Sequence, residues 1–206
     1  MTIFELLDIQ THILIAGATG SGKSVLINGY IRHILTTRPA CQLILIDPKR
    51  VDLLPFRHSP AVIYYGRTEQ AKSILTATAH LLQQRYKYIE RGTPPEQFNH
   101  VYIIIDELAD LIISDKATIN PLLKIAMTGR AARFHLITAT QRPTREMLPM
   151  AIKVNYDCRV ALRTATPQDS KNITGFQGAE RLPRFGQCLI TCPECLQPTL
   201  YTIPPP

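Results

Sequence analysis

Short apolar runs alternate with longer amphipathic stretches through the first two thirds of this chain. Runs of four or five mostly apolar residues predict buried strands, and they span residues 12–16, 42–46, 62–65, 101–105 and 135–139. Apolar residues at helical spacing predict helices over residues 23–35, 71–89 and 120–132. Strands that alternate with helices predict an α/β fold, in which a mostly parallel sheet is covered by helices on both faces to give three α/β/α layers.

The pattern weakens after Gln141. Residues 158–162 and 187–191 still have the character of strands, and residues 166–169 read as a capped helix start. A length of 206 residues fits a single domain, residues 1–206. No run approaches the ~18 apolar residues of a membrane helix, and the amino terminus lacks the features of a secretory signal. We therefore expect no membrane segment and a cytoplasmic location, which the five cysteines fit.

One segment matches a nucleotide-binding motif in full. Between the first predicted strand and the first predicted helix, the chain follows the pattern G-x-x-x-x-G-K-[ST], in the structural context that this pattern requires. Such a loop turns its main-chain N–H groups toward phosphate oxygens, and the dipole of the following helix adds positive potential. We predict that Lys23 reaches the β and γ phosphates of ATP and that Ser24 ligates Mg²⁺. The predicted nucleotide contacts are Gly17, Ala18, Thr19, Gly20, Ser21, Gly22, Lys23, Ser24, Val25 and Asp106.

Two carboxylates follow the most apolar predicted strand, residues 101–105. They stand at its carboxyl end, the edge where open α/β sheets bind ligands. We predict that Asp106 helps to hold Mg²⁺ and that Glu107 polarises the attacking water as a general base, although the pair could instead simply start the next helix. Gln141, just past the strand at 135–139, is the predicted sensor of the γ phosphate. The alternative is that it only hydrogen-bonds within its own turn.

The positive charge of the chain is unevenly distributed. The formal net charge is +7 with a pI near 9.3. Residues 121–185 hold eleven lysines and arginines against four acids, so this segment alone accounts for the whole excess. A basic half of this kind suggests a polyanionic partner such as nucleic acid, and the alternative is a solvated basic face that keeps the protein soluble.

Several segments together resemble the motor domain of the FtsK/SpoIIIE family. They are residues 12–24 (HILIAGATGSGKS), 47–53 (DPKRVDL), 84–86 (QRY), 105–111 (IDELADL) and 130–143 (RAARFHLITATQRP), in the family's order. The resemblance implies a RecA-like P-loop ATPase that translocates double-stranded DNA. It also implies assembly into hexameric homo-oligomeric rings around the duplex, with ATP bound at subunit interfaces. The chain is expected to be a short form without the upstream α/β subdomain and the downstream winged-helix module of typical members.

The resemblance assigns roles residue by residue. Lys23, Ser24, Asp106, Glu107 and Gln141 fall on matching motif positions. Arg130 matches an arginine that could reach the γ phosphate of a neighbouring subunit as a catalytic finger in trans. Family members usually have glycine at position 133, so whether Arg130 or Arg133 serves the interface stays open.

Two further functions stay open beside the DNA motor. One is a nucleotide-gated recruitment module of a mobile element, and the other is a coupling ATPase of the conjugation or secretion type. A separate question concerns Cys188, Cys192 and Cys195, whose spacing C-x₃-C-x₂-C is also seen in zinc sites. A structural zinc site needs four ligands, so free thiols or a turn held by Pro193 is the favoured interpretation.

Overall fold

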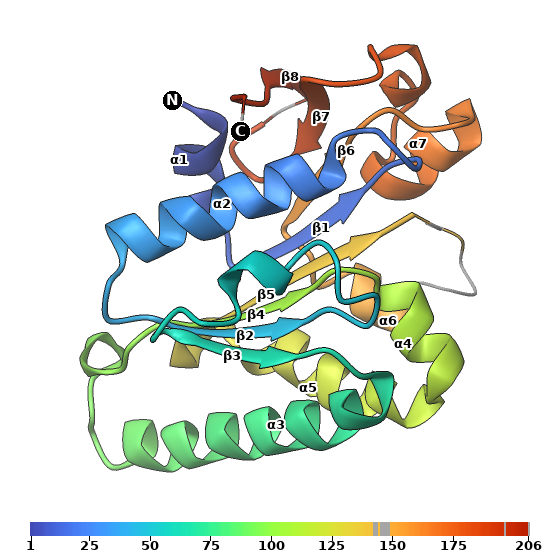
Figure 1. The fold of residues 1–206 in the computed structure, drawn as a ribbon. Coiled ribbons are helices and arrows are strands. Elements are labelled where there is room, and N and C mark those ends of the chain that lie inside the picture. Colours follow the sequence, from blue (N-terminus) through green and yellow to red (C-terminus); the bar gives the residue numbers. More distant parts are fainter. Residues whose placement is uncertain (142–143, 145–148, 196, 206) are drawn as a thin grey trace.

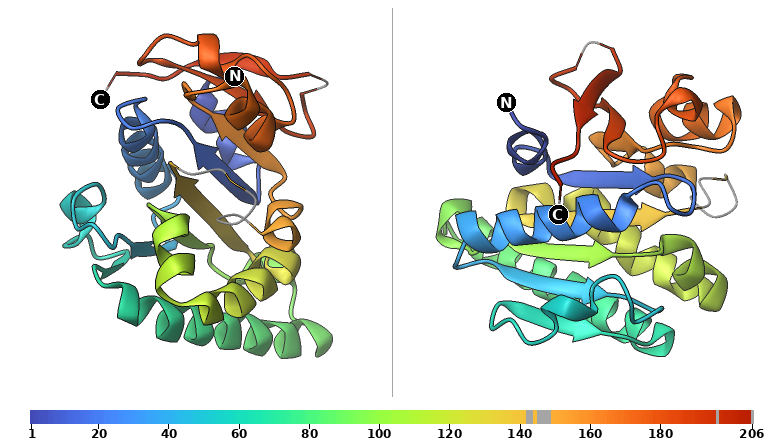
Figure 2. Two further views of the ribbon diagram at one scale, coloured as in Figure 1. Left: turned by 90° about the vertical axis from the view of Figure 1, so that its right-hand side faces the viewer. Right: turned by 45° about the horizontal axis from the view of Figure 1, so that its top comes forward.

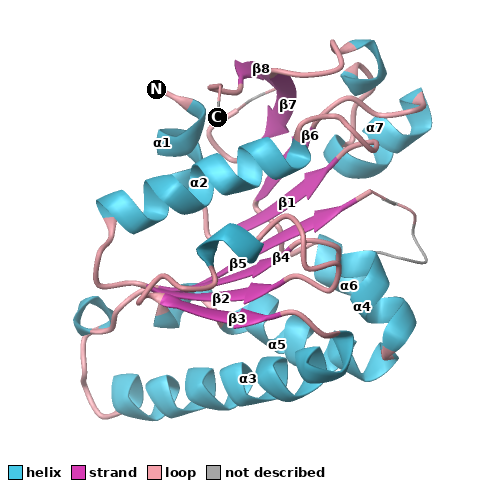
Figure 3. Cartoon of the chain, in the orientation of Figure 1, coloured by secondary structure: helices cyan, strands magenta, loops and turns pink. Residues whose placement is uncertain are grey.

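A single mixed sheet forms the centre of the protein (Figures 1 and 3). The computed structural model describes residues 1–141, 144, 149–195 and 197–205. Within them the sheet has eight strands in the order β3-β2-β4-β5-β1-β6-β7-β8. Strands β1 to β6 are parallel to one another, whereas β7 and β8 extend one edge in antiparallel pairing. The strands are β1 (His12–Ala16), β2 (Gln42–Ile46), β3 (Val62–Tyr65), β4 (Val101–Ile105), β5 (Phe134–Thr140), β6 (Cys158–Ala161), β7 (Gln187–Thr191) and β8 (Thr199–Thr202).

Helices cover both faces of the sheet, which confirms the expected three-layer α/β/α architecture (Figure 2). The helices are α1 (Ile3–Asp8), α2 (Lys23–Thr37), α3 (Thr68–Glu90), α4 (Leu108–Ser114), α5 (Ile119–Thr128), α6 (Met150–Lys153) and α7 (Pro167–Thr174). Along β1, Ile13 and Ile15 pack with α1 and α2, while Leu14 between them packs with α3, α4 and α5. Because side chains alternate across a strand, both faces of β1 lie in the apolar core and its whole sequence is apolar after His12.

The predicted elements correspond closely to the observed ones in the first part of the chain. The strands predicted at 12–16, 42–46, 62–65 and 101–105 have the observed bounds. The helix expected over residues 120–132 is shorter: α5 ends at Thr128, and a 3-10 turn, η4 (Arg130–Ala132), follows. The amides of Gly129 and Phe134 donate to Ile125 O and Gly129 O, so the chain turns here to enter β5. The remaining 3-10 turns are η1 (Leu54–Phe56), η2 (Pro95–Gln97), η3 (Lys116–Thr118) and η5 (Ala179–Arg181).

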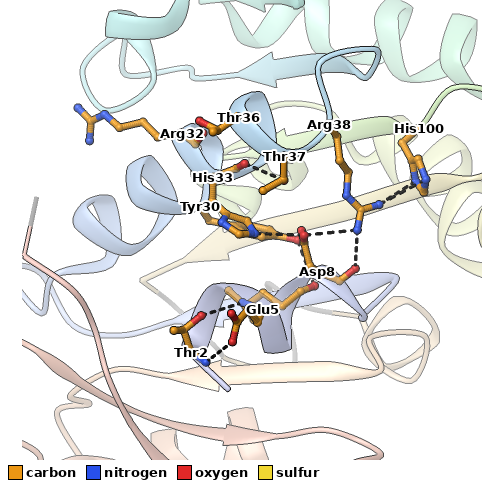
Figure 4. Close-up of polar contacts among 11 residues, drawn as sticks. Thr2, Glu5, Asp8, Tyr30, Arg32, His33, Thr36, Thr37, Arg38 and His100 are labelled. Carbon is orange, nitrogen blue, oxygen red and sulfur yellow. Dashed lines mark hydrogen bonds and ion pairs between the residues drawn. The ribbon is translucent and has the colours of Figure 1, made fainter.

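Helix α1, which the sequence pattern did not predict, is held against α2 by polar contacts (Figure 4). A capping box between Thr2 and Glu5 begins the helix. At its other end Asp8 Oδ2 lies 3.1 Å from His33 Nε2 and 3.4 Å from Arg38 Nη2, both from the carboxyl-terminal part of α2 and its cap. The hydroxyl of Tyr30 donates to Leu7 O at 3.0 Å. These contacts fix the position of α2, the helix that follows the nucleotide-binding motif.

No helix within the described ranges is long and apolar enough to cross a membrane.

Candidate active site

The strand order brings the three predicted catalytic segments to one edge of the sheet. Strand β5 lies between β1 and β4, and all three run in the same direction. The phosphate-loop motif follows β1, the acidic pair follows β4, and Gln141 follows β5. The amide of Gly17 donates to Thr140 O at 3.4 Å, so the loop after β1 lies directly against the end of β5. Segments far apart in the chain therefore meet at the carboxyl edge of the sheet.

The phosphate loop has a geometry that two of its glycines require. Gly22, immediately before α2, has a φ of 92°, in the left-handed region that side chains rarely adopt. A Cβ on Gly17 would lie 2.6 Å from Ser21 Oγ and 2.9 Å from Leu162 Cβ, so no larger residue fits there. The amides of the first turn of α2, from Lys23 onward, have no acceptor within the helix, as at every helix start. This loop is thus shaped for an anion at the amino terminus of α2.

Asp106 is a buried carboxylate whose pKa is raised. It is 2% exposed, and burial together with the nearby acids Asp52 and Asp47 raises its pKa from 3.8 to about 6, against the opposing charges of Lys23 and Lys49. Its Oδ1 is buried and has no hydrogen-bond partner among the described residues. A buried carboxylate oxygen without a donor is suited to a cation, and hard oxygen ligands such as carboxylate and hydroxyl are those that Mg²⁺ prefers. The residues at this edge therefore fit the predicted ion.

A chain of hydrogen bonds links Glu107 to the phosphate loop. The hydroxyl of Thr140 donates to Glu107 Oε1 at 2.7 Å, and the Gln141 amide donates to Oε1 and Oε2 at 3.2 and 3.1 Å. The side-chain Oε1 of Gln141 accepts a hydrogen bond of 2.8 Å from the hydroxyl of Thr19. The Gln141 side chain thus bonds across to the phosphate loop rather than within its own turn. Gln141 joins the predicted general base to the loop that would hold the phosphates.

Sequence reasoning did not assign Lys49, which the structure places beside the acidic pair. Its Nζ lies 3.7 Å from Glu107 Oε2 and 3.7 Å from Asp110 Oδ2. The loop that carries it is ordered by the fully buried Asp47, which accepts hydrogen bonds from the amides of Arg50 at 2.9 Å and Leu53 at 3.0 Å. The sequence feature that could have pointed to Lys49 is the Asp-Pro-Lys-Arg segment after β2, because β2 ends at the same edge of the sheet as β4.

Arg130 and Arg133 lie far from the phosphate loop of their own chain. They belong to η4 and its cap, which precede β5 and so lie at the amino edge of the sheet. The charge of Arg130 acts on His12 at the start of β1 and helps to lower the pKa of that histidine, after the larger effect of burial. Arg130 is exposed, whereas Arg133 is half-buried and its Nη1 donates to Phe98 O at 3.3 Å. The two arginines are therefore not equivalent.

The backbone conformation of Arg133 is one that glycine adopts more readily than a residue with a side chain. Its φ is 62°, in the left-handed region. The turn is braced by the Gln-Arg-Tyr segment of α3: Arg85 Nη1 donates to Asn99 O and Ala132 O at 2.8 Å each, and the Tyr86 hydroxyl donates to Thr128 O at 2.7 Å. The Gln-Arg-Tyr segment, one of those that resemble the family, thus stabilises the turn before β5 in this chain. Arg142 and Pro143, which end the resembling stretch 130–143, lie outside the described residues.

Four of the five cysteines lie in or near β6 and β7, and Cys41 lies just before β2. Cys192 Sγ lies 3.2 Å from Cys195 Sγ, and Cys188 is fully buried. Among the residues that the structure describes, no group of three or more His, Cys, Asp or Glu is arranged to hold a metal ion.

Solved structures share this fold, which confirms the expected RecA-like α/β architecture. The conjugation coupling protein TcpA of pCW3, in its monomer form with ATPγS, superimposes with a TM-score of 0.82 at 20% identity, over 95% of this chain and 60% of that one. The cytoplasmic domain of the type VII secretion ATPase EccC from Thermomonospora curvata gives a TM-score of 0.81 at 21% identity, over 94% of this chain and 25% of that one. At such identities the likeness concerns the fold.

Sequence comparison identifies the family. DNA translocase FtsK of Chlorobaculum tepidum is 32% identical over 227 residues, which covers 98% of this chain and 28% of that protein. DNA translocase FtsK of Helicobacter pylori (strain J99) is 36% identical over 201 residues, which covers 88% of this chain and 24% of that protein. The chain thus spans about a quarter of the length of these relatives. The model of the FtsK/SpoIIIE family matches residues 1–93 and 88–145. The chain belongs to the FtsK/SpoIIIE family.

Proposed function

We propose that this chain is a Mg²⁺-dependent ATPase motor that couples hydrolysis to the translocation of double-stranded DNA. The observation that carries the proposal is the bonded path from the phosphate loop through Gln141 to Glu107. It joins a nucleotide site to a carboxylate placed for hydrolysis, in a chain whose relatives are named DNA translocases. The motor acts in the cytoplasm, where ATP and chromosomal or mobile-element DNA are both present.

The nucleotide is held by the loop and by a small set of side chains. The loop amides and Lys23 bind the phosphates. Lys23 is only 6% exposed, so solvent screens its charge little. Ser24 and Asp106 would hold Mg²⁺, which when bound neutralises charge on the phosphate oxygens. Binding of the ion also removes the cost of burying Asp106 as an anion, since the carboxylate gains a partner.

Glu107 acts as the general base, and Gln141 as the sensor. Hydrogen bonds from Thr140 and from the Gln141 amide hold the Glu107 carboxylate in one orientation, and Lys49 lies beside it. Loss of the γ phosphate would free Thr19 in the loop, and the Thr19–Gln141 bond would pass that change to the carboxyl end of β5.

The arrangement of Arg130 favours a homo-oligomer, in the family's case a hexameric ring. Arg130 is exposed at the edge of the sheet opposite to its own phosphate loop, so it cannot reach its own nucleotide. A neighbouring subunit that docks its nucleotide edge against η4 would receive Arg130 as a finger in trans. Arg133 is held by Phe98 and by its backbone conformation, so Arg130 is the better candidate.

Basic residues near the nucleotide site provide contacts to DNA phosphates. Arg163, Lys171 and Arg181 are exposed in the segment that follows β6. This segment adjoins the phosphate loop, because the Ala18 amide donates to Arg163 O at 2.9 Å. Contacts of this kind carry affinity rather than sequence preference, and the affinity falls with salt.

The test is the ATPase rate of the full chain with double-stranded DNA, single-stranded DNA or neither, at two salt concentrations. Stimulation by duplex, weaker at high salt, is expected. A preference for single strands would favour the conjugation-type alternative. A rate that no DNA changes under any condition, although ATP is hydrolysed, would refute the motor. Loss of DNA-stimulated turnover in Glu107→Gln separates a motor from a recruitment module, which needs binding only.

A further inference from the structure

Two cysteine thiols meet in a turn between β7 and β8. Cys192 and Cys195 are separated by Pro193 and Glu194, and their Sγ atoms lie 3.2 Å apart. The Cys195 amide donates to Cys192 O at 3.0 Å, which closes a β-turn. Such a turn keeps its end Cα atoms within about 7 Å, a distance that overlaps the range a disulfide spans. A small movement of the two side chains would therefore allow a bond between the sulfurs.

The backbone of this turn is ordered before any bond forms. Pro193 stands second in the turn, where the fixed φ of its ring suits the turn conformation. Glu194 Oε2 accepts a hydrogen bond of 2.7 Å from Gln10 Nε2, and Gln10, just before β1, is only 3% exposed. The turn is thus fixed to the buried start of the first strand. Little conformational freedom remains to be lost when the thiols join.

The two thiols differ in their access to solvent. Cys192 is 8% exposed and packs in the core with Cys158 and Cys188, whereas Cys195 is partly exposed at the edge of the same core. Burial, followed by its contacts with Cys195 and Glu194, raises the pKa of Cys192 to about 12. Cys192 is therefore a neutral thiol near pH 7, and an oxidant that arrives from solvent meets Cys195 first.

We propose that Cys192 and Cys195 form a reversible disulfide, in which Cys195 reacts first with the oxidant and Cys192 completes the bond. With hydrogen peroxide as the oxidant, the Cys195 sulfur bonds to one peroxide oxygen, the O–O bond breaks, and the released hydroxide takes up the Cys195 proton as water. The Cys192 sulfur then bonds to the Cys195 sulfur, the S–O bond breaks, and the second hydroxide leaves as water with the Cys192 proton. The thiols lose two electrons, and the peroxide is reduced to two waters.

The neighbouring groups leave this pair as the reactive one. Cys158 and Cys188 are fully buried, so solvent does not reach them. Within the described ranges, no group of three His, Cys, Asp or Glu that includes the pair is arranged to hold a metal ion. Strand β7 runs antiparallel to β6, so the turn after it lies at the amino edge of the sheet, opposite to the phosphate loop. The pKa of Glu194 is lowered mainly by its bond from Gln10 and, to a smaller extent, by the charge of Arg130 at this same edge.

The experiment counts free thiols in the full chain before and after treatment with hydrogen peroxide. The protein is unfolded in guanidinium with N-ethylmaleimide and analysed by intact mass and peptide mapping. The reduced wild type should take up one label on each of its five cysteines. Peroxide should remove two labels and link Cys192 to Cys195, and dithiothreitol should restore both. Cys192→Ser should abolish the disulfide, whereas Cys188→Ala, the matched control that removes a buried cysteine outside the pair, should keep it.

The remaining outcomes overturn the proposal. A full set of labels after peroxide would show that the turn does not bring the thiols to reaction, and a bond mapped to Cys158 would assign a different pair. Oxidation of Cys195 to sulfinic acid while Cys192 stays free would show that Cys192 does not complete the bond. Zinc retained by the reduced protein at one ion per chain, and lost on oxidation, would make the cysteines metal ligands instead.

The urea midpoint gives a second measurement that needs no variant. The oxidised wild type should have a midpoint equal to or above that of the reduced protein, because the turn already has the backbone that the disulfide requires and the bond constrains the unfolded chain. A lower midpoint after oxidation, reversed by dithiothreitol, would show that the disulfide distorts the fold and would overturn the assignment of this turn as its site.

Discussion

Replacing Asp106 with asparagine is expected to stabilise the nucleotide-free protein at neutral and alkaline pH. Asp106 is almost completely buried, its pKa is raised from 3.8 to about 6, and its Oδ1 has no partner among the described residues. Asparagine has nearly the same shape and carries no charge. The substitution removes the cost of burying an anion, while the packing around the side chain stays the same.

The size of the effect follows from the pKa shift. Burying the Asp106 anion costs stability because the pKa of Asp106 is higher in the folded than in the unfolded protein. This cost is absent below pH 3.8, where Asp106 is protonated in both the folded and the unfolded protein, and it is complete above about pH 6. A shift of about 2 units corresponds to about 3 kcal/mol at pH 8, and linkage reduces it to about 1.5 kcal/mol at pH 5. The stability advantage of Asp106→Asn should therefore grow as the pH rises from 5 to 8.

Urea denaturation of the wild type and Asp106→Asn at both pH values measures this difference. The matched control is Asp157→Asn. The Asp157 carboxylate accepts hydrogen bonds from the amides of Thr11 at 3.0 Å and His12 at 2.8 Å, so this change should destabilise the protein. Mg²⁺ with a nucleotide should then raise the stability of the wild type more than that of Asp106→Asn. Destabilisation by Asp106→Asn at pH 8, or an advantage equal at the two pH values, would refute the electrostatic reasoning.

Three further predictions concern other parts of the site. Glu107→Gln should lower the ATPase rate about 10²- to 10⁴-fold in steady-state assays while ATP binding by calorimetry persists; a rate near wild type would exclude Glu107 as the base. Arg130→Ala should lower the ATPase rate of the assembled protein without changing its denaturation midpoint. Arg133→Gly should keep the ATPase rate, and because residue 133 has a φ of 62° it should leave the stability unchanged or raise it by up to about 1 kcal/mol. The reverse pattern would assign the arginine finger to Arg133. Asp47→Ala should destabilise the protein by about 1–3 kcal/mol in urea, because the buried amide of Leu53 loses its acceptor and the amide of Arg50 loses one of its two. A loss below about 0.5 kcal/mol would show that the loop does not depend on Asp47.

The central strands were predictable from the sequence because they are buried on both faces. Strands β1, β2 and β4 are continuous apolar runs because helices cover each side of the sheet. The phosphate loop was recognisable because its chemistry requires fixed residue types at fixed spacing. In each case the information lies within a few neighbouring residues.

The elements that pattern analysis missed depend on contacts between distant segments. Strand β8 is short and mostly exposed, and its pairing with β7 at the edge of the sheet is what makes it a strand. Only two residues separate the end of β4 from the start of α4, and α4 is apolar on several sides, so the change from strand to helix spacing is hard to detect. Helix α1 has only six residues, and its one sequence signal is the capping pair Thr2 and Glu5. The contact of Lys49 with Glu107 likewise joins two loops that are adjacent only once the sheet has formed.

Strand β5 connects the candidate active site at one edge of the sheet with the turn that carries Arg130 at the other. Its carboxyl end carries Thr140 and Gln141, which bond to Glu107 and, through Thr19, to the phosphate loop. Its amino end follows directly from η4, which carries Arg130. Seven residues of extended chain span about 23 Å, and every one of them is buried, so the strand is packed along its whole length. In a ring of the proposed kind, Gln141 would respond to the nucleotide of its own subunit while Arg130 acted on that of the next. A single strand would thus connect neighbouring sites, which is a physical basis for ordered hydrolysis around the ring.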